Sequence, residues 1–140
     1  MKQVLITGGA TGIGAATAQV FLERGYRVFV TVHKTAAELP GVTAIPCDIT
    51  DPAAVERLFA AVGTVDVLVN NAGISLIRQI QDTAPEDYDA LMGVNCKGVF
   101  LCSRAAAVDM LRRHSGAIVN VSSMWGQVGA SCETVYSMSK

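Results

Sequence analysis

Short runs of apolar residues alternate along the chain with longer segments whose apolar residues recur at the spacing of one helix face. The first run is Val4-Leu5-Ile6, and such continuous aliphatic runs are typical of strands buried on both faces of a sheet. The same pattern predicts strands near residues 2–7, 27–32, 42–47, 65–70 and 116–121. It predicts helices near residues 12–24, 52–62, 85–94 and 98–113.

The helix predicted over residues 52–62 has the clearest starting signals. Asp51 is a preferred N-cap residue type, and Pro52 suits a first turn, where a missing backbone N–H costs little. Its apolar face consists of Val55, Leu58, Phe59 and Val62. Because strands and helices alternate, we predict an α/β fold with a doubly wound parallel sheet of strand order 3-2-1-4-5. The length of 140 residues suits a single domain, residues 1–140.

A cluster of glycines separates the first predicted strand from the helical stretch that follows. Gly8, Gly12 and Gly14 let the backbone turn tightly and approach a bound pyrophosphate closely. The helix would then offer free N–H groups and its positive dipole end to the phosphates, and Gly25 is a typical stop signal. A glycine cluster alone could be a simple turn, but between a strand and a helix it favours nucleotide binding.

The last residues of the chain include the groups of a proton-transfer site. Tyr136 and Lys140 are four positions apart, so a helix would place them on one face. Ser123 stands thirteen positions before the tyrosine. A phenol, an ammonium and a hydroxyl suit the interconversion of a carbonyl and an alcohol. By itself, the Tyr-x-x-x-Lys spacing is equally met by a packed tyrosine beside a solvated lysine.

Taken together, these residues resemble the short-chain dehydrogenase/reductase family. The motifs that carry the resemblance follow the family's order: Thr7-Gly8-x-x-x-Gly12-Ile13-Gly14, Asp48, Asn70-Asn71-Ala72-Gly73, Asn95, Ser123 and Tyr136-x-x-x-Lys140. The resemblance implies a Rossmann fold. Family members continue past the lysine with the rest of its helix, two further strands and a lid segment. We therefore expect this chain to be the N-terminal part of a longer single-domain enzyme, with the family's C-terminal strands missing.

Two structural expectations follow from that interpretation. A helix end of about one turn is marginal in water, so we expect nothing within this chain to hold Tyr136 and Lys140 in a folded turn. We also expect the strand near residues 116–121 to form an exposed apolar edge of the sheet.

The resemblance implies four catalytic residues, Asn95, Ser123, Tyr136 and Lys140. Tyr136 would be the general acid, and the Lys140 ammonium would stabilise its ionised form and hold the nicotinamide ribose. Ser123 would donate a hydrogen bond to the substrate oxygen. Asn95 would hold a water in the proton relay, although a helix-bending or capping role is an alternative for this residue.

The resemblance also implies a set of cofactor-binding residues. Asp48 is similar to the family aspartate that contacts the adenine amine, while Asn71 and Gly73 would lie along the adenosine ribose. The full implied set is Gly8, Thr11, Gly12, Ile13, Gly14, His33, Lys34, Asp48, Ile49, Asn71, Gly73, Tyr136 and Lys140.

The end of the second predicted strand bears on the choice of cofactor. Enzymes that use NAD usually place an acidic residue there to hold the ribose 2′-hydroxyl. In this chain Val32 occupies that position and His33 and Lys34 follow, which suits a 2′-phosphate, so NADP(H) is favoured over NAD(H). The alternative is that Lys34 is merely solvated. Family members that use NADP(H) often have a basic residue where Thr11 stands, and this chain departs from that pattern.

Composition excludes several classes of protein. The chain is 51% hydrophobic and 16% charged, which is typical of a folded α/β protein rather than a disordered one. Its net charge of −1 argues against a nucleic-acid partner. No apolar run reaches about 18 residues, so we expect no membrane span and a cytoplasmic location. The 4 cysteines form no Cys-x-x-Cys pair, and we expect free thiols and no zinc site.

The substrate and the assembly are predicted from the resemblance. Residues 122–130 and 70–75 are similar to 3-oxoacyl-[acyl-carrier-protein] reductases, which implies an acyl-carrier-bound or small-molecule carbonyl substrate and a role in fatty acid biosynthesis. The alternatives are another alcohol, sugar or steroid dehydrogenase and a non-catalytic dinucleotide-binding module. Residues 98–113 are apolar on more than one helix face, and the family pairs this helix across a two-fold axis. We therefore expect a homo-oligomer, in the form of a homotetramer.

Overall fold

The predicted strands form one parallel sheet of order β3-β2-β1-β4-β5 in the computed structural model, which describes residues 1–34 and 39–140. The strands are β1 (Gln3–Ile6), β2 (Arg27–Val32), β3 (Val42–Pro46), β4 (Val67–Asn70) and β5 (Ala117–Asn120). The register places Leu5 of the central strand opposite Phe29 on one side and Leu68 on the other. The predicted fold class and strand order are therefore confirmed.

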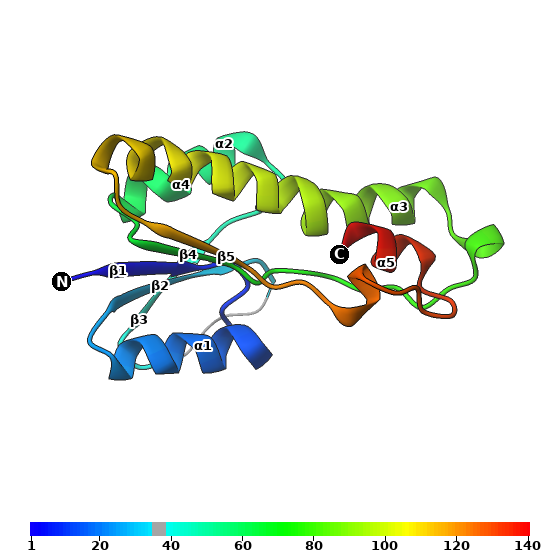
Figure 1. Cartoon of the computed structure of the whole chain (residues 1–140), viewed down its shortest axis with the longest axis horizontal. Helices are drawn as coiled ribbons and strands as arrows, with labels where there is room; N and C mark the ends of the chain where they lie inside the picture. The colour runs from blue at the N-terminus through cyan, green and yellow to red at the C-terminus, as the bar shows by residue number, and fades with distance from the viewer. Residues whose placement is uncertain (35–38) are drawn as a thin grey trace.

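Helices cover both faces of the sheet (Figure 1). Helices α2 (Pro52–Val62) and α4 (Val99–Arg113) lie on one face, and α1 (Gly12–Glu23) lies on the other. Alternate residues of β1 supply both cores, because successive side chains of a strand point to opposite faces. Leu5 belongs to the cluster that contains Leu58 of α2, whereas Val4 and Ile6 belong to the cluster that contains Ala18 of α1. Since all strands run in parallel, their carboxyl ends meet at a single edge of the sheet.

The helices predicted at 85–94 and 98–113 are joined, which the sequence analysis did not anticipate. Helix α3 (Pro85–Met92) passes through a π-helical turn, η2 (Gly93–Gly98), directly into α4. The whole helical segment, 29 residues from Pro85 to Arg113, is long and apolar enough to cross a membrane by length and composition alone. A third of its most apolar window is buried, including Leu101 and Cys102 in the core. The absence of a membrane span stays a prediction.

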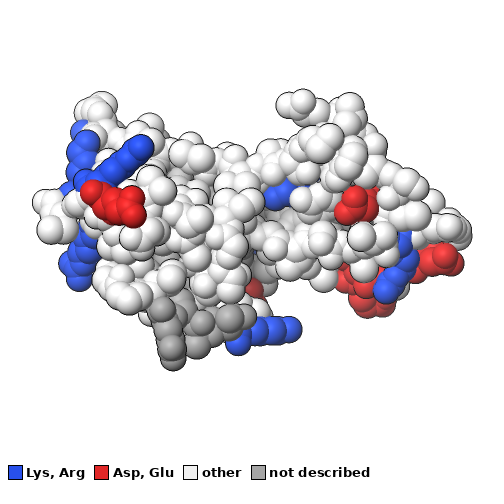
Figure 2. All heavy atoms as spheres, turned by 90° about the horizontal axis from the view of Figure 1, so that it is seen from below, with Lys and Arg blue, Asp and Glu red and all other residues white. Residues whose placement is uncertain are grey.

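The predicted exposed edge is confirmed. Every residue of β5 is exposed, and the side chains of Ile118 and Val119 are 38% and 49% accessible. Exposed apolar side chains also lie on α4, where Phe100 is 59% and Leu111 74% accessible. The side of the molecule that includes α1 carries charged side chains of both signs, and in Figure 2 these lie mostly toward its two ends.

The four cysteines are free, as predicted. Cys47 and Cys102 are buried, and burial raises the pKa of the Cys102 thiol to about 12. A thiol with such a pKa stays protonated at neutral pH and behaves as a small apolar side chain. No group of three or more potential metal-ligating side chains occurs in residues 1–34 and 39–140.

Candidate functional site

The glycine-rich loop between β1 and α1 depends on bare backbone at two positions. Gly8 has a φ of +64°, and a Cβ there would lie 2.9 Å from the Ala72 Cα. A Cβ at Gly14 would lie 2.3 Å from the Gly8 carbonyl oxygen and 2.6 Å from Asn71 Nδ2. Side chains at these positions would therefore push the loop, the helix start and the segment after β4 apart.

Thr7 and Asn71 tie this loop to the segment after β4. The Thr7 hydroxyl oxygen accepts hydrogen bonds from the backbone N–H groups of Asn71 at 3.1 Å and Ala72 at 3.0 Å. The Asn71 side-chain amide donates to the carbonyl oxygens of Thr7 at 3.1 Å and Gly8 at 3.0 Å. The expected role of Asn71 beside a ribose stays a prediction, but the structure gives its amide a clear role in fixing the loop.

A cleft of about 440 Å³ lies at the carboxyl ends of the strands, next to this loop. Eight of the predicted cofactor-binding residues line it: Gly8, Thr11, Ile13, His33, Asp48, Ile49, Asn71 and Gly73. Gly12, Gly14, Lys34, Tyr136 and Lys140 do not line it. The predicted residues thus converge on one cavity, although they come from four different segments of the chain.

Asp48, after β3, is held in a fixed orientation beside the cleft. Its Oδ1 accepts hydrogen bonds from the Thr50 N–H at 2.9 Å and the Thr50 hydroxyl at 2.7 Å. These two bonds, with smaller contributions from the charges of His33 and Lys97, hold the pKa of the Asp48 carboxyl below its ordinary value. An ionised, oriented carboxylate is a suitable acceptor for an amine of a bound base.

The end of β2 presents backbone and basic side chains to the same region. Val32 is the last residue of the strand, His33 lines the cleft, and Lys34 is exposed outside it. Thr31, one residue earlier, is buried and its hydroxyl oxygen accepts a hydrogen bond from the Gly8 N–H at 3.0 Å. This bond joins the second strand to the glycine-rich loop.

Asn95 lies in the π-helical turn and is 6% exposed. Its Oδ1 accepts a hydrogen bond from the Ile74 N–H at 2.9 Å, and its Nδ2 donates to the Ile74 carbonyl at 2.8 Å and to Ser139 Oγ at 2.8 Å. Isolated π turns are rare and frequently occur at functional sites. The side chain therefore joins the segment after β4 to the last helix, and its role in holding a water stays a prediction.

The last helix, α5 (Thr134–Ser139), carries Tyr136, and Lys140 follows it. Lys140 Nζ donates to the Val121 carbonyl at 2.9 Å and lies 6.0 Å from the centroid of the Tyr136 ring. A Cβ at Gly73 would be only 3.4 Å from Lys140 Nζ. Because Gly73 lines the cleft, the ammonium reaches the edge of the same cavity.

Ser123 lies between β5 and a short 3-10 helix, η3 (Met124–Gly126). Its Oγ accepts a hydrogen bond from the Trp125 N–H at 3.2 Å, which leaves the hydroxyl hydrogen to donate. Within residues 1–34 and 39–140, no hydrogen bond joins Ser123 to Tyr136.

The expectation that nothing in the chain holds the turn of Tyr136 and Lys140 is wrong. The Ser122 hydroxyl donates to the Lys140 carbonyl at 2.8 Å, and the Lys140 N–H donates to the Tyr136 carbonyl at 3.1 Å. Together with the bond from Asn95 to Ser139, these contacts fix the short helix from both sides. Tertiary hydrogen bonds compensate for the helix length that local propensity alone would need.

Comparison with known families fits this geometry. The family model described as short chain dehydrogenase matches residues 2–140. The chain belongs to the short-chain dehydrogenase family. The resemblance inferred from its motifs is thereby confirmed.

Relatives of the chain have names that state different reactions. The cyclopentanol dehydrogenase of Comamonas sp. is 37% identical over 153 residues, covering 99% of this chain and 61% of that protein. The 3-oxoacyl-[acyl-carrier-protein] reductase FabG of Thermotoga maritima is 38% identical over 153 residues, covering 99% of this chain and 62% of that protein. The chain thus spans about three fifths of the length of these relatives.

Solved structures of similar proteins contain nicotinamide cofactors of both kinds. A 4-hydroxyisoleucine dehydrogenase complexed with NADH has a TM-score of 0.91 at 26% identity, covering 99% of this chain and 63% of that one. ElxO with NADP bound has a TM-score of 0.88 at 32% identity, covering 99% of this chain and 62% of that one.

The sequence did not predict five residues that line the cleft. They are Thr31, Cys47, Ala72, Ile74 and Val94. The first four lie at or just after the carboxyl ends of β2, β3 and β4, so the rule that ligands bind beyond these ends could have found them. Val94 comes from the π-helical turn, and no local pattern in the sequence places that turn against the cleft.

Proposed function

We propose that this protein is an NADP(H)-dependent oxidoreductase that interconverts a carbonyl and an alcohol. The observation that carries the proposal is the approach of Lys140 to Gly73, which places the helix of Tyr136 at the edge of the cleft. The proposal treats residues 1–140 as one dinucleotide-binding domain. Membership of the family supports it, and the whole protein's activity remains the subject of the test below.

The residues of the cleft fit a dinucleotide. Bare backbone at Gly8 and Gly14 forms a cradle that a Cβ would fill. Helix α1 begins without a side-chain cap at Thr11 and without an acidic residue in its first turn, so its free N–H groups favour an anion such as pyrophosphate. Asp48 at the other end of the cleft is suited to the adenine amine.

The catalytic step follows from the chemistry of four side chains. The bound nicotinamide would supply or accept the hydride. In the direction of reduction, the Tyr136 hydroxyl donates its proton to the carbonyl oxygen as negative charge develops there. The Lys140 ammonium stabilises the phenolate that remains, and the Ser123 hydroxyl donates a second hydrogen bond to the substrate oxygen. Asn95 keeps the π-helical turn in register with α5 and would hold a water for reprotonation.

The preference for NADP(H) rests on the end of β2. Val32 leaves no carboxylate there to repel a 2′-phosphate, and His33 lines the cleft as a possible donor. Lys34 is exposed, so its contribution would be that of a nearby positive charge. One similar structure contains NADH and the other contains NADP, so the fold alone does not determine which cofactor binds. We therefore base the preference for NADP(H) on the residues at the end of β2.

For the substrate, we propose a 3-oxoacyl thioester carried by an acyl-carrier protein, in line with the FabG relative. An alicyclic secondary alcohol is the second candidate, because the cyclopentanol dehydrogenase is 37% identical, almost as similar as the 38% of FabG. We further propose a cytoplasmic homotetramer that uses the exposed apolar face of α4.

An assay of NADPH oxidation with a panel of substrates tests the proposed function. The protein expressed from its complete reading frame is compared with residues 1–140, using 3-oxoacyl thioesters and cyclopentanone. We expect kcat/KM for the best thioester to exceed that for cyclopentanone by at least about tenfold. The reverse ratio favours the second candidate. NADPH binding with no oxidation of the cofactor by any carbonyl would make the protein a non-catalytic binding module.

A further inference from the structure

We propose that Ser139 is a positioning residue that sets the Tyr136–Lys140 pair against the π-helical turn, an inference that rests on the proposed function. Ser139 immediately precedes Lys140 and is one of the few buried polar residues among those described, with 7% of its surface exposed. Neither the motifs of the sequence nor the family resemblance assigned it a role.

The Ser139 hydroxyl uses both of its hydrogen-bonding functions. It donates to the Tyr136 carbonyl at 2.8 Å and accepts from Asn95 Nδ2 at 2.8 Å. The Ser139 carbonyl in turn accepts a hydrogen bond from the Cys96 thiol at 3.3 Å. One residue therefore connects the general acid's own backbone to two consecutive residues of the π-helical turn.

Because these bonds hold the short helix that carries Tyr136, their loss would lower the rate of the reaction and not only the stability of the fold. Helix α5 has 6 residues, too few to hold its own geometry in water. The side of the helix facing η2 is fixed through Ser139, while the opposite contact is the bond from Ser122 to the Lys140 carbonyl. Loss of one side lets the helix tilt, and a shift of about 1 Å in a catalytic group can cost on the order of 100-fold in rate.

Substitution of Ser139 by alanine leaves one specific group without a partner. The Tyr136 carbonyl still accepts from the Lys140 N–H at 3.1 Å, so its hydrogen bonding is retained. Asn95 Nδ2 keeps the Ile74 carbonyl but loses Ser139 Oγ in a buried site. The Asn95 amide would then turn or draw in water, and the bond from the Cys96 thiol to the Ser139 carbonyl, a weaker one, would be left to join η2 to α5.

Steady-state kinetics of the protein from its complete reading frame test this role. We expect Ser139→Ala to lower kcat about tenfold while the KM of each substrate stays within about twofold, as for a loss confined to the transition state. Ser137→Ala is the matched control, because Ser137 lies on the same helix and, among the described residues, its hydroxyl is hydrogen-bonded only to the Ala130 N–H at 3.4 Å. That variant should keep kcat within about twofold.

A second substitution distinguishes the effect of losing the hydroxyl from the effect of changing the size of the side chain. Ser139→Thr retains the hydroxyl, and a threonine in a helix can still bond a carbonyl one turn back, so we expect kcat within about threefold of the unmodified protein. The proposal is overturned if Ser139→Ala keeps full kcat, if the alanine and threonine variants are equally slow, or if kcat and cofactor affinity fall together.

Hydrogen exchange distinguishes a failure of this proposal from a failure of the proposed function. If the unmodified protein reduces no carbonyl, the proposed function fails, and the positioning role is judged by exchange alone. We expect the amides of residues 134–140 to exchange about tenfold faster in Ser139→Ala than in Ser137→Ala. Equal exchange in the two variants contradicts a positioning role, whether or not the protein is an enzyme.

Discussion

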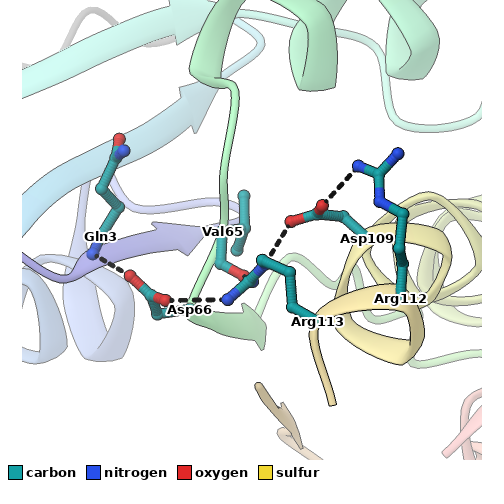
Figure 3. A network of polar contacts seen from close by, with 6 residues as sticks. All are labelled: Gln3, Val65, Asp66, Asp109, Arg112 and Arg113. Atoms are coloured by element: carbon teal, nitrogen blue, oxygen red, sulfur yellow. Dashed lines mark hydrogen bonds and ion pairs between the residues drawn. The ribbon is translucent and has the colours of Figure 1, made fainter. Parts of the chain in front are cut away.

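The polar groups at the two ends of the parallel sheet have different partners. Where the strands begin, side chains bind one another (Figure 3). Arg113 donates to the Val65 carbonyl at 3.0 Å and to Asp109 at 2.6 Å, and lies 3.4 Å from Asp66. Asp66 also accepts a hydrogen bond from the Gln3 N–H at 2.8 Å. At this end of the sheet, the polar groups therefore pair with one another in a network of ion pairs and hydrogen bonds.

Where the strands end, glycines keep the backbone bare and polar groups face a cleft. In the part of the chain that the structure describes, the Asp48 carboxylate is hydrogen-bonded through Oδ1 alone, and the Thr11 side chain does not cap the first N–H groups of α1. Lys140 reaches the edge of this cleft through a helix held by tertiary hydrogen bonds. Polar groups at the first end therefore bind one another, whereas several at the second end line a cleft.

The largest expected effect is at the general acid. Tyr136→Phe removes the proton donor and leaves the ring, so we expect kcat to fall by about 10²- to 10⁴-fold with NADPH affinity nearly unchanged. Tyr88→Phe is the control, because Tyr88 lies on α3 with 41% of its surface exposed. Stopped-flow or steady-state oxidation of NADPH measures both variants. Full activity of Tyr136→Phe would refute the proposed role of Tyr136.

The second effect tests the bare backbone of the cleft. Gly14→Ala places a methyl group 2.3 Å from the Gly8 carbonyl oxygen, so the loop must move. We expect NADPH to bind about 100-fold more weakly, measured by fluorescence titration. Gly129→Ala is the matched control, because a Cβ there meets no atom within 4 Å. Equal affinity of the two variants would show that the cradle is not needed for binding.

The third effect concerns cofactor choice at the end of β2. Val32→Asp introduces a carboxylate that repels a 2′-phosphate and can bind a ribose 2′-hydroxyl, so we expect preference to shift toward NADH by about tenfold. Val32→Asn has nearly the same size without the charge and should shift preference much less. Titrations with both cofactors measure the ratio. Preference for NADH in the unmodified protein would overturn the assignment of NADP(H).

The smallest effect on activity is expected at the opposite end of the sheet. Arg113→Met keeps an unbranched apolar stem in place of the arginine's methylene groups but removes the guanidinium, and we expect the midpoint of urea unfolding to fall by roughly 0.3–0.8 M. The expected effect is modest because 28% of the arginine side chain is exposed. Because this network lies at the opposite end of the sheet from the cleft, we expect kcat and NADPH affinity not to change. A loss of activity in a stable Arg113→Met variant would contradict the prediction that this end of the sheet affects stability alone.

The sequence predicted those elements whose signals are local. The structure has β2 at residues 27–32 and α2 at 52–62, as predicted, because the apolar period, the Asp51 cap and Pro52 all lie within the elements themselves. The π-helical turn was not predicted, since Gly93 and Gly98 weaken a helical pattern and no period distinguishes a π turn from a break.

The candidate site was predicted only where its residues belong to motifs. Its cofactor-binding and catalytic assignments stay predictions, but most of the former line a single cleft. The contact between Asn95 and Ser139 joins residues 44 positions apart, and the helix turn at Lys140 depends on Ser122. Such bonds depend on the packing of distant segments, so no spacing rule in the sequence reveals them.

Hydrogen exchange with and without NADPH tests the contrast between the two ends most directly, because it requires no knowledge of the substrate. We expect bound NADPH to slow exchange in residues 7–14 and 70–74, at the carboxyl ends of the strands. We expect no change in residues 63–66 and 108–114, where Asp66 and Arg113 already bind each other. Protection of the second set, or protection of neither set at saturating NADPH, would contradict this difference between the two ends.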